Sequence, residues 1–275
     1  MSLLSDGVPL DSVIPDEVSL KRFWQNHIQS SNLVQTAVTC GLHADRLAWI
    51  FCSAYQCALR AEIPGIPDHE WWALAASEDT RGELPGVRYD KGILNGFKTW
   101  VAASKLVDAV VVTVGRSAYV VRRDASGTEI KTYPAGSFLG DMSVGRLELN
   151  GVAVDDPIDL GRDVALTEPF YITAAALGYL LKEATHLDAR ASITETRSCI
   201  EALGDLEARG YIDHIDAFAG LYRRVSDLGK TMGEISKAAA DQRAGDWERN
   251  GKLLSMYRRG IEKRLSSAGL YDLGR

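Results

Sequence analysis

The side chains that most often carry chemistry are scattered along this sequence. The five histidines occur one at a time, so no cluster has the spacing of a metal site. The cysteines also lack metal-ligand spacing, and we interpret them as reduced structural thiols on helices: Cys40, Cys52, Cys57 and Cys199. The sequence therefore predicts no metal centre.

The most specific residues lie between Trp71 and Gly151, where the hydrophobic pattern changes from helix-like to strand-like. Short runs rich in Val, Leu, Tyr and Trp alternate with Gly, Pro, Asn and Asp, which is typical of short β-strands. We expect about six or seven strands in an antiparallel barrel or sandwich. Two Asn-Gly pairs, Asn95-Gly96 and Asn150-Gly151, predict tight turns because both residue types tolerate positive φ.

Helical patterns flank this β-region on both sides. Before it, we expect one helix at about 15–28 and a long one at about 33–59, which ends at the Pro-rich linker IPGIP. After it, the spacing predicts four amphipathic helices, at about 169–187, 190–208, 211–241 and 247–267. The predicted fold class is α+β, with N-terminal helices at 1–67, a β-domain at 68–160 and a C-terminal four-helix bundle at 161–275.

Composition and charge exclude several classes of partner. The net charge is −6, with 31 basic and 37 acidic residues well mixed, so there is no electrostatic footprint for nucleic acid or an anionic membrane. The opening residues MSLLSDGVPLDSV lack the features of a secretion signal, and we expect no apolar run of the length that a bilayer needs. We therefore expect a cytoplasmic protein with no nucleic-acid partner and no membrane partner.

Four stretches follow one another in the β-region: ALAASE, LNGFKTWVAAS, VDAVVVTVG and VGRLELNGVAVDD. Taken in this order, they resemble the middle β-domain of the acyl-CoA dehydrogenase family. ALAASE resembles the family's aromatic-x-x-Thr-Glu strand, VDAVVVTVG a later strand that begins with Ala-Asp, and VGRLELNGVAVDD the last strand. The stretch LNGFKTWVAAS is the most specific. It matches the family's Leu-Asn-Gly-x-Lys-x-Trp-Ile-Thr strand at the same spacing through Asn95, Gly96, Lys98 and Trp100. The chain thus resembles a shortened member of the family.

The resemblance implies an FAD enzyme that removes two hydrogens from Cα and Cβ of an acyl-CoA thioester. Ser77 stands at the family's threonine that faces the flavin ring, and Trp100 at the tryptophan that packs beside it. Ala102 replaces a threonine that contacts the flavin, so only its backbone could serve. The ring is expected at the junction of the β-domain and the bundle. The alternative is that Trp100 is a core aromatic and that Ser77 only satisfies a neighbouring strand.

Other parts of the family's site are changed or missing. The Gly-Ser-Asp loop aligns with Gly82-Glu83-Leu84, and the Arg-x-x-Phe-Gly and Gln-x-x-Gly-Gly-x-Gly segments are not found. One family position for the catalytic base, in a Leu-Asp-x-Glu-Arg segment of the first bundle helix, aligns with Ala189. The other resembles Tyr271-Asp272-Leu273-Gly274. Glu183 and Glu195 are alternatives, but most helix carboxylates are solvated, so the catalytic residue is left unknown.

Two functions of different classes remain open. The first is an FAD-dependent oxidoreductase acting on the CH–CH group of an acyl thioester or a related small-molecule substrate. The second is a relative without chemistry that serves as a scaffold or as the non-catalytic subunit of a hetero-oligomer. A flavin monooxygenase, which needs no carboxylate base, is a further possibility. The resemblance, with apolar Tyr179, Leu180 and Leu253 off the main stripe of the bundle, predicts a homodimer or homotetramer.

Overall fold

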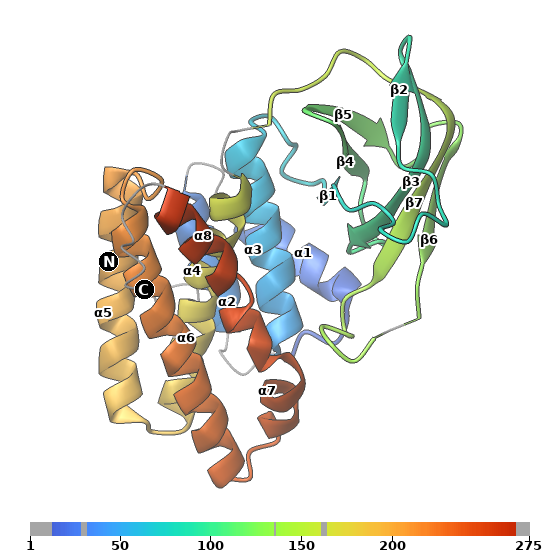
Figure 1. The fold of residues 1–275 in the computed structure, drawn as a ribbon. Coiled ribbons are helices and arrows are strands. Elements are labelled where there is room, and N and C mark those ends of the chain that lie inside the picture. The colour runs from blue at the N-terminus through green and yellow to red at the C-terminus, as the bar shows by residue number, and fades with distance from the viewer. Residues whose placement is uncertain (1–12, 29–31, 135, 161–163, 268–275) are drawn as a thin grey trace. The chain divides into compact units, whose positions relative to one another are not determined.

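The computed structural model describes residues 13–28, 32–134, 136–160 and 164–267, and the chain divides into two compact units (Figure 1). The first, called the β-unit, contains the described parts of residues 15–26 and 59–162. The second, called the helical unit, contains the described parts of residues 1–14, 27–58 and 163–275. Each unit is therefore assembled from segments that are distant in sequence.

In the described part of the β-unit, the strands form two sheets, in the orders β1-β4-β5 and β2-β3-β7-β6. The predicted α+β class is confirmed, but these strands do not close into a barrel, and β1 pairs with β4 in parallel. Parallel pairing is possible because the whole chain from β2 to β3 intervenes as a crossover. The strands are β1 (Trp72–Ala75), β2 (Arg88–Asp90), β3 (Ile93–Ala102), β4 (Ala109–Val114), β5 (Ser117–Arg122), β6 (Thr128–Thr132) and β7 (Val144–Ala153).

The two Asn-Gly pairs are not tight turns, and this prediction is wrong. They lie inside β3 and β7 and meet at a β-bulge, where the Asn95 side chain accepts a hydrogen bond from the Gly151 N–H at 2.7 Å. The expected positive φ is present at Gly96 (126°) and Gly151 (70°). A bulge requires such a backbone as much as a turn does, so the local signal was correct about conformation but not about topology.

The first helix, α1 (Glu17–His27), packs its residues up to 26 within the β-unit. Trp24 lies edge-on to Trp71, with ring centroids 6.2 Å apart. Lys21 forms an ion pair of 2.7 Å with Asp108, whose carboxylate also accepts the Trp71 N–H at 2.7 Å. These contacts hold Trp71, the residue directly before β1, in place.

The remaining helices depart from the prediction at two places. The long helix expected at 33–59 is divided, because Ala44 has an extended backbone with ψ 135°. The helix expected at 247–267 is three short elements, of which the second has 3-10 geometry. The helices are α2 (Leu33–His43), α3 (Leu47–Glu62), α4 (Val164–His186), α5 (Arg190–Arg209), α6 (Ile215–Ala238), α7 (Ala244–Asn250), the 3-10 helix η1 (Gly251–Ser255) and α8 (Arg258–Ser267).

The core of the helical unit is α4. Its mean hydropathy of 1.4 over a membrane-length window is high enough to cross a bilayer, but 83% of that window is buried inside the protein. The expectation of no membrane-length apolar run is therefore incorrect, because a helix surrounded by others is apolar on all sides. Glycines bring α4 close to α2: a Cβ at Gly178 would lie 2.1 Å from the Val38 carbonyl oxygen, and one at Gly41 1.9 Å from that of Ala175.

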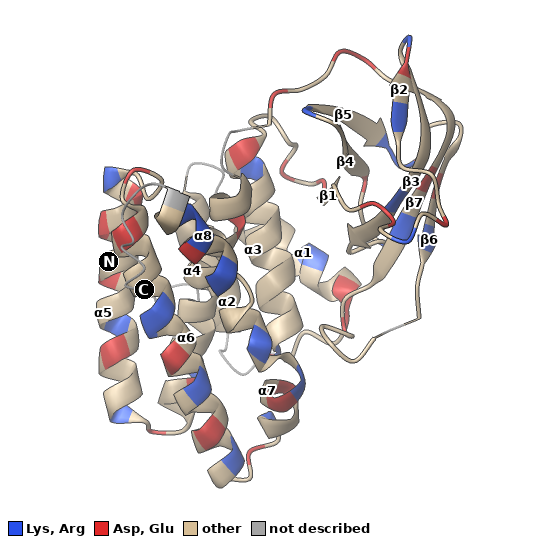
Figure 2. Ribbon diagram, in the orientation of Figure 1, with Lys and Arg blue, Asp and Glu red and all other residues tan. Residues whose placement is uncertain are grey.

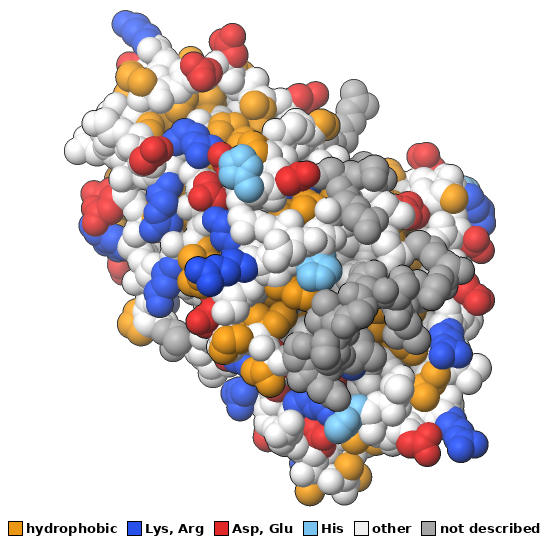
Figure 3. Space-filling model, turned by 180° about the vertical axis from the view of Figure 1, so that it is seen from behind, with side chains coloured by type: hydrophobic (Ala, Val, Ile, Leu, Met, Phe, Trp, Pro, Cys, Tyr) orange, Lys and Arg blue, Asp and Glu red, His pale blue; other side chains and the backbone are white. Residues whose placement is uncertain are grey.

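Charged residues lie mainly on the outer helices. Both signs are interspersed along α5, α6 and α8, whereas α3 carries few charges (Figure 2). Seen from behind, the described side chains of both signs are scattered among small hydrophobic areas (Figure 3). The mixing of charge that the composition indicates is thus also present on the folded surface.

Gly178→Ala should destabilise the protein by on the order of 2–3 kcal/mol, because the new methyl group would overlap the Val38 carbonyl and force α2 from α4. Gly204→Ala is the matched control, since a Cβ at this exposed position of α5 meets nothing within 4 Å. It should stabilise by roughly 0.5–1 kcal/mol through helix propensity. Thermal unfolding followed by circular dichroism measures both, and equal midpoints would contradict the close packing.

Candidate functional site

Trp100 lies on a second β-bulge of β3. Between the pairs Lys98–Leu147 and Val101–Gly145 the register shifts, so that Thr99 and Trp100 together oppose the single residue Arg146 of β7. Trp100 is half-buried, and Arg146 has its guanidinium carbon 6.0 Å from the ring of Phe97. Bulges occur often beside active sites because they redirect a side chain out of the strand's alternation. The bulge therefore gives Trp100 an orientation that strict alternation would not provide.

Ser77 is brought directly beside this bulge. The N–H and the hydroxyl of Thr99 both donate to the Ser77 carbonyl oxygen, at 2.9 and 3.2 Å. Ser77 is exposed, and within the described ranges its own N–H and hydroxyl make no hydrogen bond. The Ser77 N–H and hydroxyl are therefore two available donors beside Thr99, the residue that precedes Trp100. A flavin ring, which is planar and carries hydrogen-bond acceptors, requires such donors.

A buried lysine holds Ser77 in place from both sides. Lys98 is 2% exposed, and its ammonium donates to the Glu78 carboxylate at 2.7 Å and to the Ala76 carbonyl at 3.4 Å. The hydrogen bond from Lys98 lowers the pKa of the Glu78 carboxyl. Since Ala76 and Glu78 flank Ser77, one cation positions the residues on either side of the expected flavin contact.

The loop after Glu78 is organised by its own side chains. The Asp79 carboxylate accepts the N–H groups of Arg81, Glu83 and Leu84, at 2.9, 2.7 and 2.9 Å. These hydrogen bonds, first of all that from Arg81, lower the pKa of Asp79. Gly82 has φ 77°, which glycine adopts without strain. The Glu83 side chain, at the position of the family's small residue, is exposed.

Ala102, the third residue predicted to contact the cofactor, is at the end of β3. It is 1% exposed and pairs with Val144 of β7. Its contact with a cofactor stays a prediction. Beside the second bulge of β3, the features that fit a flavin ring are therefore the half-exposed indole of Trp100 and the available donors of Ser77.

The acids considered as catalytic bases lie in different surroundings. Glu195 is on the surface of α5, 44% exposed, and pairs with Arg224 at 2.8 Å. Glu183 of α4 is fully buried and pairs with Arg243 at 2.6 Å. Burial raises the pKa of Glu183, and Arg243 opposes this shift. Asp272 lies outside the described residues. Neither of the described acids combines accessibility with an uncommitted carboxylate.

Glu168 is a candidate that the sequence analysis missed. It lies near the start of α4, is partly exposed, and accepts a hydrogen bond from the Tyr257 hydroxyl. Burial of its carboxyl raises the pKa of Glu168, which the Tyr257 hydrogen bond opposes. The helix was expected to begin at Pro169, which would leave Glu168 outside it. It begins at Val164, so Pro169 lies inside the helix and Glu168 belongs to it.

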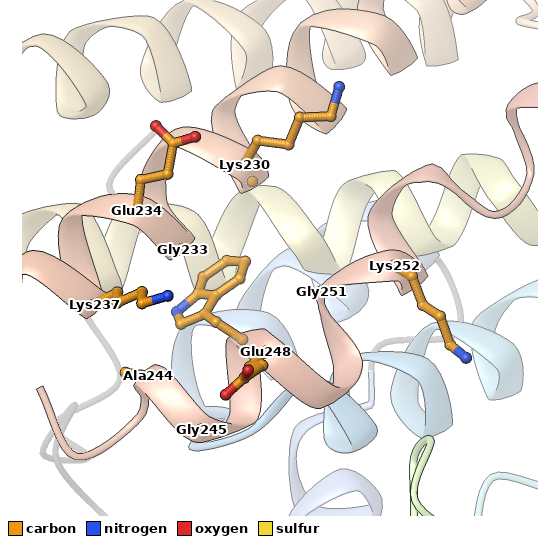
Figure 4. A pocket seen from close by; sticks show the side chains of 11 residues that line it. Lys230, Gly233, Glu234, Lys237, Ala244, Gly245, Glu248, Gly251 and Lys252 are labelled. Carbon is orange, nitrogen blue, oxygen red and sulfur yellow. The ribbon is translucent and has the colours of Figure 1, made fainter.

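A groove of about 420 Å³ lies within the helical unit, between α6 and the α7–η1 segment (Figure 4). The Lys237 side chain extends across it, whereas those of Lys230 and Lys252 point away from its centre (Figure 4). Its wall combines glycines, one indole and charges of both signs: Gly229, Lys230, Gly233, Glu234, Lys237, Ala244, Gly245, Trp247, Glu248, Gly251 and Lys252. None of the residues considered above for the cofactor or the base lines this groove.

No protein-family model and no curated protein sequence matches the chain. Solved structures do match it. Butyryl-CoA dehydrogenase from Megasphaera elsdenii has a TM-score of 0.71 at 11% identity, covering 93% of this chain and 90% of that one. PigA with FAD and proline has 0.69 at 12% identity, covering 92% and 89%. FkbI, described for biosynthesis of a methoxymalonyl extender unit, has 0.68 at 15% identity, covering 96% and 93%.

The chain has the acyl-CoA dehydrogenase fold. At these identities the likeness shows the fold, and it extends over nearly the full length of both chains in each comparison. Within the acyl-CoA dehydrogenase fold, Ser77 and Trp100 come together through contacts that involve Thr99 and Lys98, as described above. The arrangement of these residues in the β-unit is thus established independently of any cofactor.

Removing either partner of the Lys98–Glu78 pair should have unequal effects on stability. Glu78→Ala leaves the buried Lys98 ammonium without its carboxylate and should cost on the order of 3 kcal/mol. Lys98→Met should cost less, because it fills the same space with an apolar chain and leaves a carboxylate that is 45% exposed to water. Denaturant unfolding compares the two, and a larger loss for Lys98→Met would show that the cation is not the constrained partner.

Proposed function

We propose that the protein is an FAD-dependent oxidoreductase of the acyl-CoA dehydrogenase type, which acts on the CH–CH group of an acyl thioester or a related substrate. One observation carries the proposal. The N–H and hydroxyl of Ser77 have no hydrogen-bond partner in the described chain, and they lie beside the bulge that presents Trp100. Such a pair of donors beside a half-exposed indole suits a flavin ring.

Glu168 is the proton acceptor in this proposal. Its carboxylate takes the α-proton of the substrate, which leaves the electron pair to form the double bond between Cα and Cβ. Bound FAD supplies the acceptor for the β-hydride. A carboxylate whose pKa is raised by burial is a stronger base than a solvated one, and its partial exposure leaves a path for a reacting group. Within α4, the ion pair with Arg243 makes Glu183 the poorer choice.

The alternative is a scaffold or non-catalytic subunit with the acyl-CoA dehydrogenase fold. The missing pyrophosphate segment and the alanine at Ala189 favour it. The two proposals differ in a property that is simple to observe, the visible absorption of the freshly purified protein. A protein that contains flavin is yellow, and one that neither retains flavin nor binds added FAD would support the scaffold.

We also propose that the protein is a homodimer or homotetramer. The likeness to the acyl-CoA dehydrogenase fold is the remaining support for this proposal. The apolar residues that suggested an uncovered surface, Tyr179, Leu180 and Leu253, are each 0% exposed within the chain. They therefore give no support for an interface, because α4 and η1 are covered by neighbouring helices. Light scattering of a dilute sample tests the assembly, and a monomer mass would contradict it.

Trp100→Ala should weaken FAD retention strongly, because it removes a stacking surface worth on the order of 3 kcal/mol if the ring is buried. Thr99→Val is the matched control. Valine keeps the shape of Thr99, the other residue of the bulge, and loses only the hydrogen bond from the threonine hydroxyl to the Ser77 carbonyl. Bound flavin per chain should be compared under conditions of equal thermal stability. If both variants retain flavin equally, Trp100 does not contact the ring.

Glu168→Gln should leave FAD binding unchanged and abolish reduction of the flavin by substrate, since the amide cannot accept the α-proton. The measurement is anaerobic titration with a panel of acyl-CoA thioesters, followed by the loss of visible flavin absorbance. Glu195→Gln, at an exposed position of α5, is the control and should be reduced like the parent protein. Full reduction of the Glu168→Gln variant would exclude Glu168 as the base.

A further inference from the structure

Glu168 and Tyr257 form a pair that joins the start of α4 to the segment between η1 and α8. Tyr257 lies between η1 and α8, so 89 residues separate it from Glu168. Its hydroxyl donates directly to the carboxylate. Burial together with the charge of Glu168 raises the pKa of the Tyr257 hydroxyl far above its usual value, so it remains a proton donor at neutral pH.

A second tyrosine holds Tyr257 in position. The Tyr257 N–H donates to the hydroxyl of Tyr222, on α6, at 3.1 Å. Tyr222 is 3% exposed, and burial raises its pKa to about 12. Its backbone carbonyl also accepts the Ser226 hydroxyl at 2.9 Å. The backbone at Tyr257 is therefore attached to the buried face of α6, which limits the positions that its side chain can occupy.

Aromatic residues occur next to Glu168 in the sequence of α4 and among the groups that act electrostatically on Tyr257. Phe170, two residues after Glu168, stacks on Tyr211 with ring centroids 3.9 Å apart, and the Tyr211 hydroxyl is 2.9 Å from that of Thr167. The groups that act electrostatically on the Tyr257 hydroxyl are Glu168, Tyr222 of α6 and Tyr55 of α3. The neighbouring Arg258 instead pairs with Glu262 of α8, at 2.7 Å. A carboxylate in such a place depends strongly on each hydrogen bond that it receives.

We propose that Tyr257 is a positioning residue for Glu168, whose hydroxyl fixes the direction of the carboxylate by a direct hydrogen bond. The assignment of a task to that carboxylate rests on the proposed function, whereas the coupling of the two side chains does not. The hydroxyl occupies one oxygen of the carboxylate, so the other oxygen is left to accept a proton. Tyr222 acts through Tyr257, by holding its backbone.

The coupling predicts a particular dependence of stability on pH. The pKa of Glu168 is raised above 4.5 in the folded chain, so the folded state holds the proton more tightly than the unfolded state. The contribution of Glu168 to stability is therefore largest at low pH and falls as pH rises from about 4.5 through the folded pKa. Because the Tyr257 bond opposes the shift, its loss should move this fall to higher pH.

The experiment is a double-mutant cycle on the full chain without added flavin or substrate. Thermal unfolding midpoints are measured from about pH 5 to pH 8 for the parent, Tyr257→Phe, Glu168→Gln and the double variant. Tyr257→Phe should move upward the pH at which stability falls, because the hydrogen bond that opposes the raised pKa of Glu168 is lost. Glu168→Gln should remove the part of the fall that Glu168 contributes and leave the part due to other buried carboxyls such as Glu183, and Tyr257→Phe should then add no change that depends on pH.

Two results would overturn the proposal. One is a pH profile of Tyr257→Phe identical to that of the parent, and the other is a shift that persists with Gln at position 168. Circular dichroism checks that each variant is folded. If Tyr257→Phe does not fold, Tyr222→Phe replaces it, and should give a smaller shift in the same direction that Glu168→Gln also removes. Because no cofactor is needed, failure of flavin binding and failure of the coupling are separate outcomes.

Discussion

The position of the candidate site depends on the need to satisfy one buried cation. The Lys98 ammonium is almost inaccessible to water, so it must find protein acceptors or incur a large desolvation penalty. It finds them at Ala76 and Glu78, which brings the chain after β1 against β3 and leaves Ser77 between two fixed neighbours. The carboxylate of the pair stays partly hydrated, so only one charge is removed from water.

Glycine makes this arrangement sterically possible. A Cβ at Gly86 would lie 2.4 Å from the Glu78 carboxylate, and one at Gly96 would lie 2.4 Å from the Gly86 carbonyl oxygen. Gly96, whose Cβ would meet backbone, lets the loop that follows Glu78 return onto β3, and Gly86 leaves room for the Glu78 carboxylate. The second bulge of β3 then redirects Trp100 beside the segment that Lys98 has fixed. The ion pair, the glycines and the bulge act on the same short length of backbone.

Two glutamates of α4, the buried Glu183 and the partly exposed Glu168, show how a hydrogen-bond partner determines what a carboxylate can do. Glu183 meets a guanidinium, and the ion pair attaches the segment after α6 to the core helix. Glu168, about four turns earlier, meets only a phenol, which orients it without neutralising it. A positive charge beside a carboxylate holds it in an ion pair and favours its ionised form, whereas a neutral donor leaves the carboxylate more able to bind a proton.

Much of the architecture could be predicted from local pattern. The change of hydrophobic period located the β-region and the flanking helices, and the LNGFKTW stretch indicated the fold and the candidate site residues, because period and spacing are properties of neighbouring residues. The folded chain alone decided the rest. The Asn-Gly pairs became a bulge because they face each other from β3 and β7, and Tyr179 became core because other helices surround α4. The Glu168 carboxylate receives its hydrogen bond from Tyr257, 89 residues away. These features depend on partners that only tertiary contact supplies, since sequence spacing carries no information about which distant side chain will meet a given carboxylate.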